Sequence, residues 1–248
     1  MRLKKVMMDR DFQILRFLFQ QKIASLNTVW NFFFTHTSRN SCTKRMQKLI
    51  TYGLVGKTGY NKDSKRLQVA YYLTQKGYRV IKDNLCLLRD TATFKSDSIE
   101  HDIQLSEIRE KVSKLNSVER YYSENAIKNL DLGVFEEKIR PYKVLRSDAV
   151  LELNLEDESF FVALEYERER KQESKYRRKI RDYYLESSAL AAFYICKEPA
   201  IIKTIRKVDK EVSQKFDNPK IYTILEKDFQ NTEGKLAFRN SENGIFHI

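Results

Sequence analysis

The chain has 248 residues, of which 42% are hydrophobic and 32% charged, with a formal net charge of +12. This composition suits one large or two small globular domains, and scarce glycine and proline with three scattered cysteines argue against a disordered or disulfide-framed chain. No apolar run approaches the roughly 20 residues that cross a bilayer. The first residues lack the apolar stretch of a secretory signal. We therefore expect a cytoplasmic protein with no membrane insertion.

The positive charge is concentrated in the first third of the chain. Residues 1–90 contain 18 Lys and Arg against 5 Asp and Glu, a net of +13, and no glutamate occurs before Glu100. The remainder contains 28 against 29, a net of −1, which returns the total of +12. Two modules with different roles are the simplest explanation. The field of the basic module suits nucleic acid better than a membrane surface, because no exposed amphipathic anchor is evident.

The basic module is predicted to contain helices, a hairpin and a closing helix. Apolar residues recur at helical spacing from residue 12 to 23, and Asp9 or Asp11 is placed to cap that helix. A short helix follows within residues 25–34. Ser38 or Ser41 can cap a third helix, which Gly53 can end in a left-handed cap. Residues 54–60 and 67–74 read as two strands around a basic turn, and Thr74 can cap the closing helix.

This order of elements resembles a winged helix-turn-helix from about residue 9 to residue 83. The resemblance implies that the third helix enters the major groove of double-stranded DNA and that the hairpin, as the wing, contacts phosphates. A solvated basic face on a small helical domain is the alternative. The predicted DNA-binding residues are Arg39, Asn40, Thr43, Lys44, Arg45, Lys48, Lys62, Lys65 and Arg66.

After a connector at residues 85–97, the pattern changes to helices alternating with strands. A helix at 99–115, a strand at 118–125 and a hairpin of strands at 148–155 and 160–167 come first. A helix at 171–187, an apolar strand at 189–197, a helix at 200–216 and a strand at 220–226 follow. The order α-β-β-β-α-β-α-β predicts a mixed sheet flanked by helices, and the whole chain is expected to be α+β or α/β.

The second hairpin strand carries two glutamates that should lie on one face of the sheet. Residues two apart along a strand point the same way, so Glu165 and Glu167 share a face with small Ala163. Asp148 begins the paired strand and can meet them. Three convergent carboxylates favour a cation such as Mg²⁺ or Mn²⁺ between them. The alternative is an exposed strand face whose glutamates pair with Arg168 or Arg170.

The hairpin aspartate followed by the acid-x-acid strand, between two helices, resembles the PD-(D/E)xK nuclease core. Ser147 stands in place of the proline and Glu167 in place of the lysine. The resemblance implies a lysine supplied by the next helix, with Lys179 preferred and Lys171 second. It also implies that His101 and Asp102, in the preceding helix, lie near the metal. The predicted catalytic residues are Asp148, Glu165, Glu167, Lys179 and His101, and the predicted metal ligands are Asp148, Glu165, Glu167, His101 and Asp102.

A basic winged helix followed by this core is similar to the replication-relaxation family, and within it to the MOBC-type relaxases of mobilisable plasmids. The resemblance implies a winged-helix domain at 1–84, a linker at 85–97 and a restriction-endonuclease-like domain at 98–248. It implies an Mg²⁺- or Mn²⁺-dependent endonuclease, a hydrolase that nicks DNA at an origin of transfer, working with accessory mobilisation proteins and a coupling protein. Two alternatives stay open. One is a non-catalytic regulator of plasmid replication or transcription with a decayed nuclease core, and the other is a nuclease of host defence or transposition.

Overall fold

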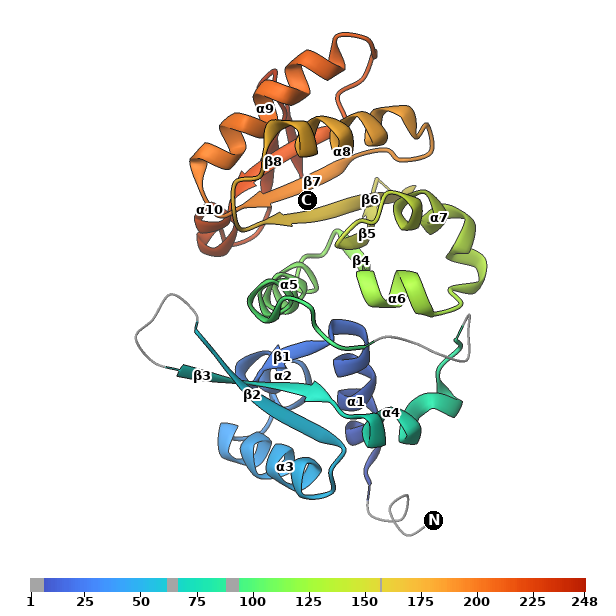
Figure 1. Ribbon diagram of the computed structural model, residues 1–248, viewed down its shortest axis with the longest axis vertical. Helices are drawn as coiled ribbons and strands as arrows, with labels where there is room; N and C mark the ends of the chain where they lie inside the picture. Colours follow the sequence, from blue (N-terminus) through green and yellow to red (C-terminus); the bar gives the residue numbers. More distant parts are fainter. Residues whose placement is uncertain (1–6, 62–66, 88–93, 157) are drawn as a thin grey trace. The chain divides into compact units, whose positions relative to one another are not determined.

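The computed structural model of the chain describes residues 7–61, 67–87, 94–156 and 158–248, which form two compact units (Figure 1). Unit 1 comprises Met1–Glu110 and Lys128–Leu132, and unit 2 comprises Lys111–Ile127 and Gly133–Ile248. The predicted domain limits at residues 84 and 98 stay a prediction.

Unit 1 contains helices and a small antiparallel sheet. The sheet has the strand order β1-β3-β2, with β1 and β2 both antiparallel to β3. The predicted helices and hairpin strands of the basic module are present, and the helix from residue 99 begins in this unit. The elements are α1 (Asp9–Gln21), β1 (Ile23–Ser25), α2 (Leu26–Phe33), α3 (Arg39–Thr51), β2 (Val55–Asn61), β3 (Leu67–Leu73), α4 (Gln75–Ile81), the 3-10 helix η2 (Lys82–Asn84) and α5 (Ile99–Val112).

Local polar contacts begin and end these helices largely as the sequence predicts. Ser38 accepts a hydrogen bond from the Ser41 amide at the start of α3, and Thr74 accepts one from the Gly77 amide at the start of α4. Gly53 follows α3 with a φ of +70°, the left-handed conformation that glycine adopts most readily. Of the two residues predicted to cap the start of α1, Asp11 is confirmed, through its side chain. Met8 is the cap residue, and the carboxylate of Asp11 accepts a hydrogen bond from the Met8 amide at 2.8 Å.

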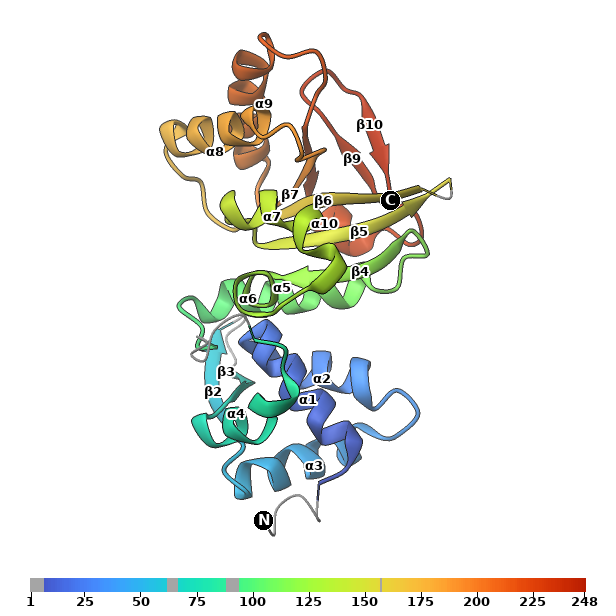
Figure 2. The same cartoon turned by 90° about the vertical axis from the view of Figure 1, so that its right-hand side faces the viewer.

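Unit 2 is built on a seven-stranded mixed sheet flanked by helices (Figure 2). The strand order is β10-β9-β8-β7-β6-β5-β4; β6, β7 and β8 run parallel, and the other neighbours are antiparallel. The elements after α5 are β4 (Val118–Ser123), α6 (Glu124–Asn129), the 3-10 helix η3 (Gly133–Phe135), α7 (Glu136–Val144), β5 (Ala149–Leu155), β6 (Glu158–Glu167), α8 (Glu173–Leu185), β7 (Ala192–Cys196), α9 (Pro199–Ser213), β8 (Ile221–Leu225), α10 (Glu226–Asn231), β9 (Ala237–Arg239) and β10 (Ile245–His247).

The predicted mixed sheet with flanking helices is confirmed, and five further α-helices and β-strands after α5 were not predicted. These are α6, α7, α10, β9 and β10. Four of them have six or fewer residues, too few to show a clear hydrophobic period. The fifth, α7, contains Pro141, a residue that normally signals a helix end.

The register of the strands assigns each side chain to one face of the sheet. Glu165 of β6 pairs with Tyr194 of β7, which pairs with Thr223 of β8, so these three share a face. Helices α8 and α9 cover it, because Tyr183 of α8 bonds Glu165 and Arg206 of α9 donates to Thr223 at 2.9 Å. We call it the α8 face. On the opposite face, the Tyr166 hydroxyl reaches Glu226 of α10 at 3.3 Å.

Within the described residues, no helix combines the length and the apolar character that spanning a membrane requires.

Candidate active site

Three acidic side chains gather where β6 ends and β5 begins, on the α8 face. Glu165 and Glu167 close the C-terminal end of β6, and Asp148 precedes the first residue of β5. Ala149 pairs with Leu164, which places Asp148 opposite Glu165. We call these three residues the carboxylate cluster. It lies at the carboxyl end of a strand in the parallel part of the sheet, the edge at which α/β proteins commonly bind ligands.

Glu165 is held by the helix that follows it in the chain. Its side chain accepts a hydrogen bond from the Tyr183 hydroxyl and lies 3.1 Å from the Lys179 ammonium. The Tyr183 hydroxyl also contacts the Ser147 hydroxyl at 2.7 Å, beside Asp148. Tyr183 therefore links the residue preceding Asp148 to Glu165.

Glu167 has an equivalent set of partners from the connection between β6 and α8. The Lys171 ammonium lies 2.8 Å from Oε1 of Glu167, and the Tyr176 hydroxyl lies 3.4 Å from Oε2. Each glutamate thus has one lysine and one tyrosine, all four supplied by the segment from 171 to 183.

Asp148 is oriented by the strand that carries the glutamates. Its Oδ2 accepts a hydrogen bond from the Tyr166 amide at 2.9 Å, and its own carbonyl accepts one from the Glu124 amide. Tyr166 lies between the two glutamates in sequence. The carboxylate of Asp148 is consequently directed toward the end of β6.

The electrostatics of the cluster follow from burial. Burial raises the pKa of Glu165 to about 7; Lys179 opposes the rise and the Asp148 charge adds to it. Burial also raises the pKa of Glu167, against the opposing charge of Lys171. Crowded carboxylates in a dry site favour either protons or cations. The cluster is therefore a place where a positive charge is stabilised.

The alternative of an exposed strand face is wrong. Glu165 and Glu167 are each 5% exposed, and they form ion pairs with Lys179 and Lys171. The predicted convergence of two glutamates on one face is confirmed by their common contacts with α8.

The two lysines differ in what surrounds them. Lys179 Nζ donates to the carbonyls of Leu145 (2.7 Å) and Arg146 (3.0 Å) as well as facing Glu165, so it binds the loop that leads into Asp148. The side chain of Lys171 is 51% exposed, and Glu167 is its ion-pair partner. Lys179 thus stabilises the loop before Asp148 through two hydrogen bonds, whereas the ammonium group of Lys171 is closer to solvent.

The carboxylate oxygens of the cluster are chemically suitable ligands for a divalent cation. Carboxylate oxygens are the ligands that Mg²⁺ and Mn²⁺ prefer. A second fitting feature is the Tyr194 hydroxyl on the same face, which is fully buried and has no hydrogen-bond partner among the described residues. With the lysines and tyrosines in place as described, however, no group of three His, Cys, Asp or Glu side chains in the ranges given above is arranged to hold a metal ion.

The other two predicted metal ligands belong to unit 1. His101 Nδ1 lies 3.4 Å from Asp102 Oδ1, and the Asp102 carboxylate lies 3.9 Å from Lys22 Nζ. Both are in the first turn of α5. Their role as metal ligands stays a prediction.

The predicted DNA-binding side chains of α3 have two kinds of surroundings. Arg45 forms an ion pair with the buried carboxylate of Asp11, with Nε 2.6 Å from Oδ1, so its guanidinium ties α3 to α1. Lys62, Lys65 and Arg66 of the predicted wing lie outside the described residues. The exposed members of the set are Arg39, Asn40, Thr43, Lys44 and Lys48.

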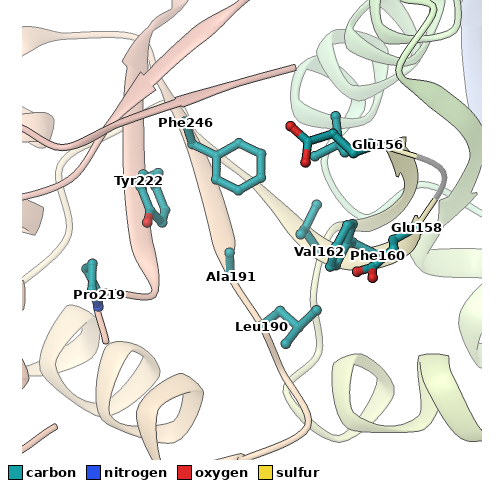
Figure 3. A pocket seen from close by; sticks show the side chains of 10 residues that line it. Glu156, Glu158, Phe160, Val162, Leu190, Ala191, Pro219, Tyr222 and Phe246 are labelled. Carbon is teal, nitrogen blue, oxygen red and sulfur yellow. The ribbon is translucent and has the colours of Figure 1, made fainter. Parts of the chain in front are cut away.

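A separate pocket of about 540 Å³ opens on the face of the sheet opposite the cluster (Figure 3). Phe160 and Val162 of β6, Tyr222 of β8 and Phe246 of β10 line it, and Glu156 stands at its rim. The lining is mainly apolar and carries no lysine. Within the described part of the chain, its two carboxylates, Glu156 and Glu158, therefore lack the lysine partners that the carboxylate cluster has.

Three tyrosines of the site were not assigned functions from sequence. Tyr176 and Tyr183 share a helix face with Lys179, but their hydroxyl partners lie on another element. Tyr194 could have been recognised from the sequence as a candidate site residue, because its hydroxyl lies in the middle of an otherwise apolar strand.

Comparison of the chain with models of protein families, with curated proteins and with solved structures finds no match in any of the three.

Proposed function

We propose that this protein is a divalent-cation-dependent DNA endonuclease that nicks one strand at a specific site, as a relaxase does at a plasmid origin of transfer. The observation that carries the proposal is the carboxylate cluster with its two lysines, in a chain whose first 90 residues have a net charge of +13. Carboxylates that hold a cation, beside lysines that face a phosphate, are the groups that phosphodiester hydrolysis needs.

In this proposal unit 1 is a winged helix that binds double-stranded DNA. Support comes from the order of its helices and hairpin and from the exposed polar and basic side chains of α3, among them Arg39, Asn40 and Lys44. A helix of this kind reads base edges in the major groove, while lysines and arginines contact phosphates. Unit 1 would select the site, with accessory proteins adding to that selection.

Unit 2 would be a restriction-endonuclease-like core. Asp148, Glu165 and Glu167 would hold Mg²⁺ or Mn²⁺, which when bound polarises a phosphate and lowers the pKa of water. Tyr183 and the Tyr166 amide orient the carboxylates. Lys171 and Lys179 place positive charge beside the position at which a phosphate would gain negative charge.

The second candidate is a DNA-binding regulator without catalytic activity. It is favoured by the ion pairs of Glu165 with Lys179 and of Glu167 with Lys171, which give each glutamate a partner within the fold. If these pairs are purely structural, the cluster needs no cation.

The deciding experiment is a nicking assay on supercoiled plasmid that carries the DNA flanking the gene of this protein. We expect conversion to open circle with Mg²⁺ or Mn²⁺ and none with EDTA, and we expect Asp148→Asn and Glu165→Gln to abolish it. Glu152→Gln is the matched control, since Glu152 is equally buried on the same face but is bonded to Tyr122 instead.

Tight DNA binding without nicking under any metal would favour the regulator. Nicking of plasmids regardless of sequence would favour a nuclease of defence or transposition.

A further inference from the structure

Tyr194 occupies the centre of the α8 face, in the most buried part of the sheet. It is the third residue of β7, a five-residue strand in which every residue is buried. Its neighbour in the register on β6 is Glu165, and Cys196 is the neighbour of Glu167. Tyr194 therefore shares both strand level and sheet face with the carboxylate cluster.

The hydroxyl of Tyr194 lies within the field of the cluster. Its pKa is raised well above the ordinary value, first by burial and then by the carboxylates of Glu165 and Glu167, with smaller effects of Cys196 and Asp148. The carboxylates of Glu165 and Glu167 act on the hydroxyl because they lie on the same face of the sheet, with Glu165 the register neighbour of Tyr194. The phenol therefore stays protonated and can both donate and accept a hydrogen bond.

This hydroxyl differs from those of the tyrosines nearby. Tyr176, Tyr183 and Tyr184 each bond a carboxylate, whereas Tyr194 has no partner among the described residues. Leaving a buried hydroxyl unbonded costs about 1–3 kcal/mol. Phenylalanine would fill the position without that cost, as Phe193 does on the opposite face.

A hydrated cation would supply the missing partner. Mg²⁺ and Mn²⁺ bound by a few carboxylates usually keep several water molecules, and each such water needs hydrogen-bonding groups around it. A neutral phenol is a poor direct ligand for a hard cation but a good partner for a coordinated water.

We propose that the Tyr194 hydroxyl lines the buried side of the cation site. There it hydrogen-bonds a water molecule that is coordinated to the divalent cation held by Asp148, Glu165 and Glu167. This inference rests on the proposed function for the cation itself. Tyr194 is thereby a positioning residue, since it acts through the water and does not touch the substrate.

The test is Mn²⁺ binding to the full chain, measured by titration calorimetry or electron paramagnetic resonance, together with urea unfolding in EDTA. We expect Tyr194→Phe to weaken Mn²⁺ binding about 5- to 10-fold, the worth of one hydrogen bond. The same substitution should leave the metal-free protein as stable as the wild type or more stable, because it removes an unbonded buried hydroxyl. A merely structural tyrosine would not combine these two effects.

Tyr222→Phe is the matched control, because it makes the same change in the same sheet but on the pocket face (Figure 3). It should leave Mn²⁺ affinity unchanged. Asp148→Asn should abolish binding and so locate the ion in the cluster.

Three outcomes would overturn the inference. Mn²⁺ affinity of Tyr194→Phe equal to that of the wild type excludes the hydroxyl from the site. A fall in affinity matched by a similar loss of metal-free stability assigns Tyr194 to the fold alone. Absence of Mn²⁺ binding by the wild type removes both the inference and the cation-dependent function. Binding that depends on Tyr194 in a protein that never nicks DNA would leave the inference standing and reject the endonuclease.

Discussion

The carboxyl group of Glu165 is a titratable group buried in the protein interior. It lies under α8, 5% exposed, with the Tyr183 hydroxyl and the Lys179 ammonium as partners. Neither partner cancels the effect of burial on its pKa. The contribution of Glu165 to the free energy of unfolding can therefore be measured in the metal-free protein.

Stability in EDTA should therefore depend on pH through Glu165. Its pKa in the folded protein is about 7, above the ordinary 4.5, so the carboxyl group contributes stability that is fully present below pH 4.5 and lost as pH rises to 7. The shift corresponds to about 3 kcal/mol. Subtracting the urea-unfolding free energies of Glu165→Gln from those of the wild type between pH 4 and 8 isolates this contribution. A difference that stays constant with pH would contradict the assignment.

Lys179 and Lys171 should differ in their effect on stability. Lys179→Met leaves two carbonyls and the buried Glu165 without their ammonium group, and we expect it to cost about 2–3 kcal/mol. Lys171→Met removes a half-exposed partner of Glu167 and should cost about 1 kcal/mol. Urea unfolding at neutral pH in EDTA measures both, and the reverse order would show that Lys179 does not hold the loop before Asp148.

At the scale of elements, α8 determines the geometry of the candidate site. Its first half supplies Tyr176 to Glu167, and its second half supplies Lys179 and Tyr183 to Glu165 and to the loop before β5. The helix follows β6 directly in the chain, so the acids and their partners are brought together by a short connection. In unit 1, the ion pair between Arg45 of α3 and Asp11 of α1 likewise connects two elements.

Breaking that ion pair should destabilise unit 1. Asp11 is fully buried, and Arg45 binds both oxygens of its carboxylate. Arg45→Met leaves a buried charge unpaired, at an expected cost of about 3 kcal/mol by urea unfolding. The double variant with Asp11→Asn should recover part of this loss.

Arg39→Met, on the exposed start of the same helix, is the control and should change stability by less than about 0.5 kcal/mol. Equal effects of Arg39→Met and Arg45→Met would mean that the pair contributes nothing to the fold.

For the whole molecule, the uneven distribution of charge is the dominant property. The proposed DNA binding predicts that the first part of the chain contacts the phosphates, because residues 1–90 carry +13 and the rest −1. This prediction makes the dependence of DNA binding on salt a measure of which residues contact phosphate.

Neutralising two exposed cations of α3 should flatten that salt dependence. We expect Arg39→Gln with Lys44→Gln in the full chain to reduce the slope of log K against log salt by about 2, at roughly 0.9 per phosphate contact. Lys203→Gln with Lys210→Gln on α9 makes the same change in net charge in unit 2 and should leave the slope unchanged. Fluorescence anisotropy with a DNA duplex from 50 to 300 mM salt measures both. Equal slopes for the two double variants would remove α3 from the interface.

The sequence by itself determined the features that arise from neighbouring residues. Ser38 and Thr74 cap their helices, Gly53 ends α3, and Glu165 and Glu167 share a face, because caps depend on three or four residues and strand alternation has a period of two. The net charge of the first 90 residues can be counted from the sequence without any knowledge of the fold. Short elements such as β9 and β10, and the Pro141-containing α7, escaped prediction because their residues do not show a period.

The tertiary structure decided which of these residues have partners. Only the packing of α8 on the sheet pairs Glu165 with Lys179 and Tyr183. Only the register between β6 and β7 places Tyr194, whose hydroxyl has no partner among the described residues, on the face of the acids. Likewise Arg45, which looks like a DNA contact on a helical wheel, binds Asp11 of another helix. Contacts of this kind join residues distant in the chain, and local periodicity carries no information about them.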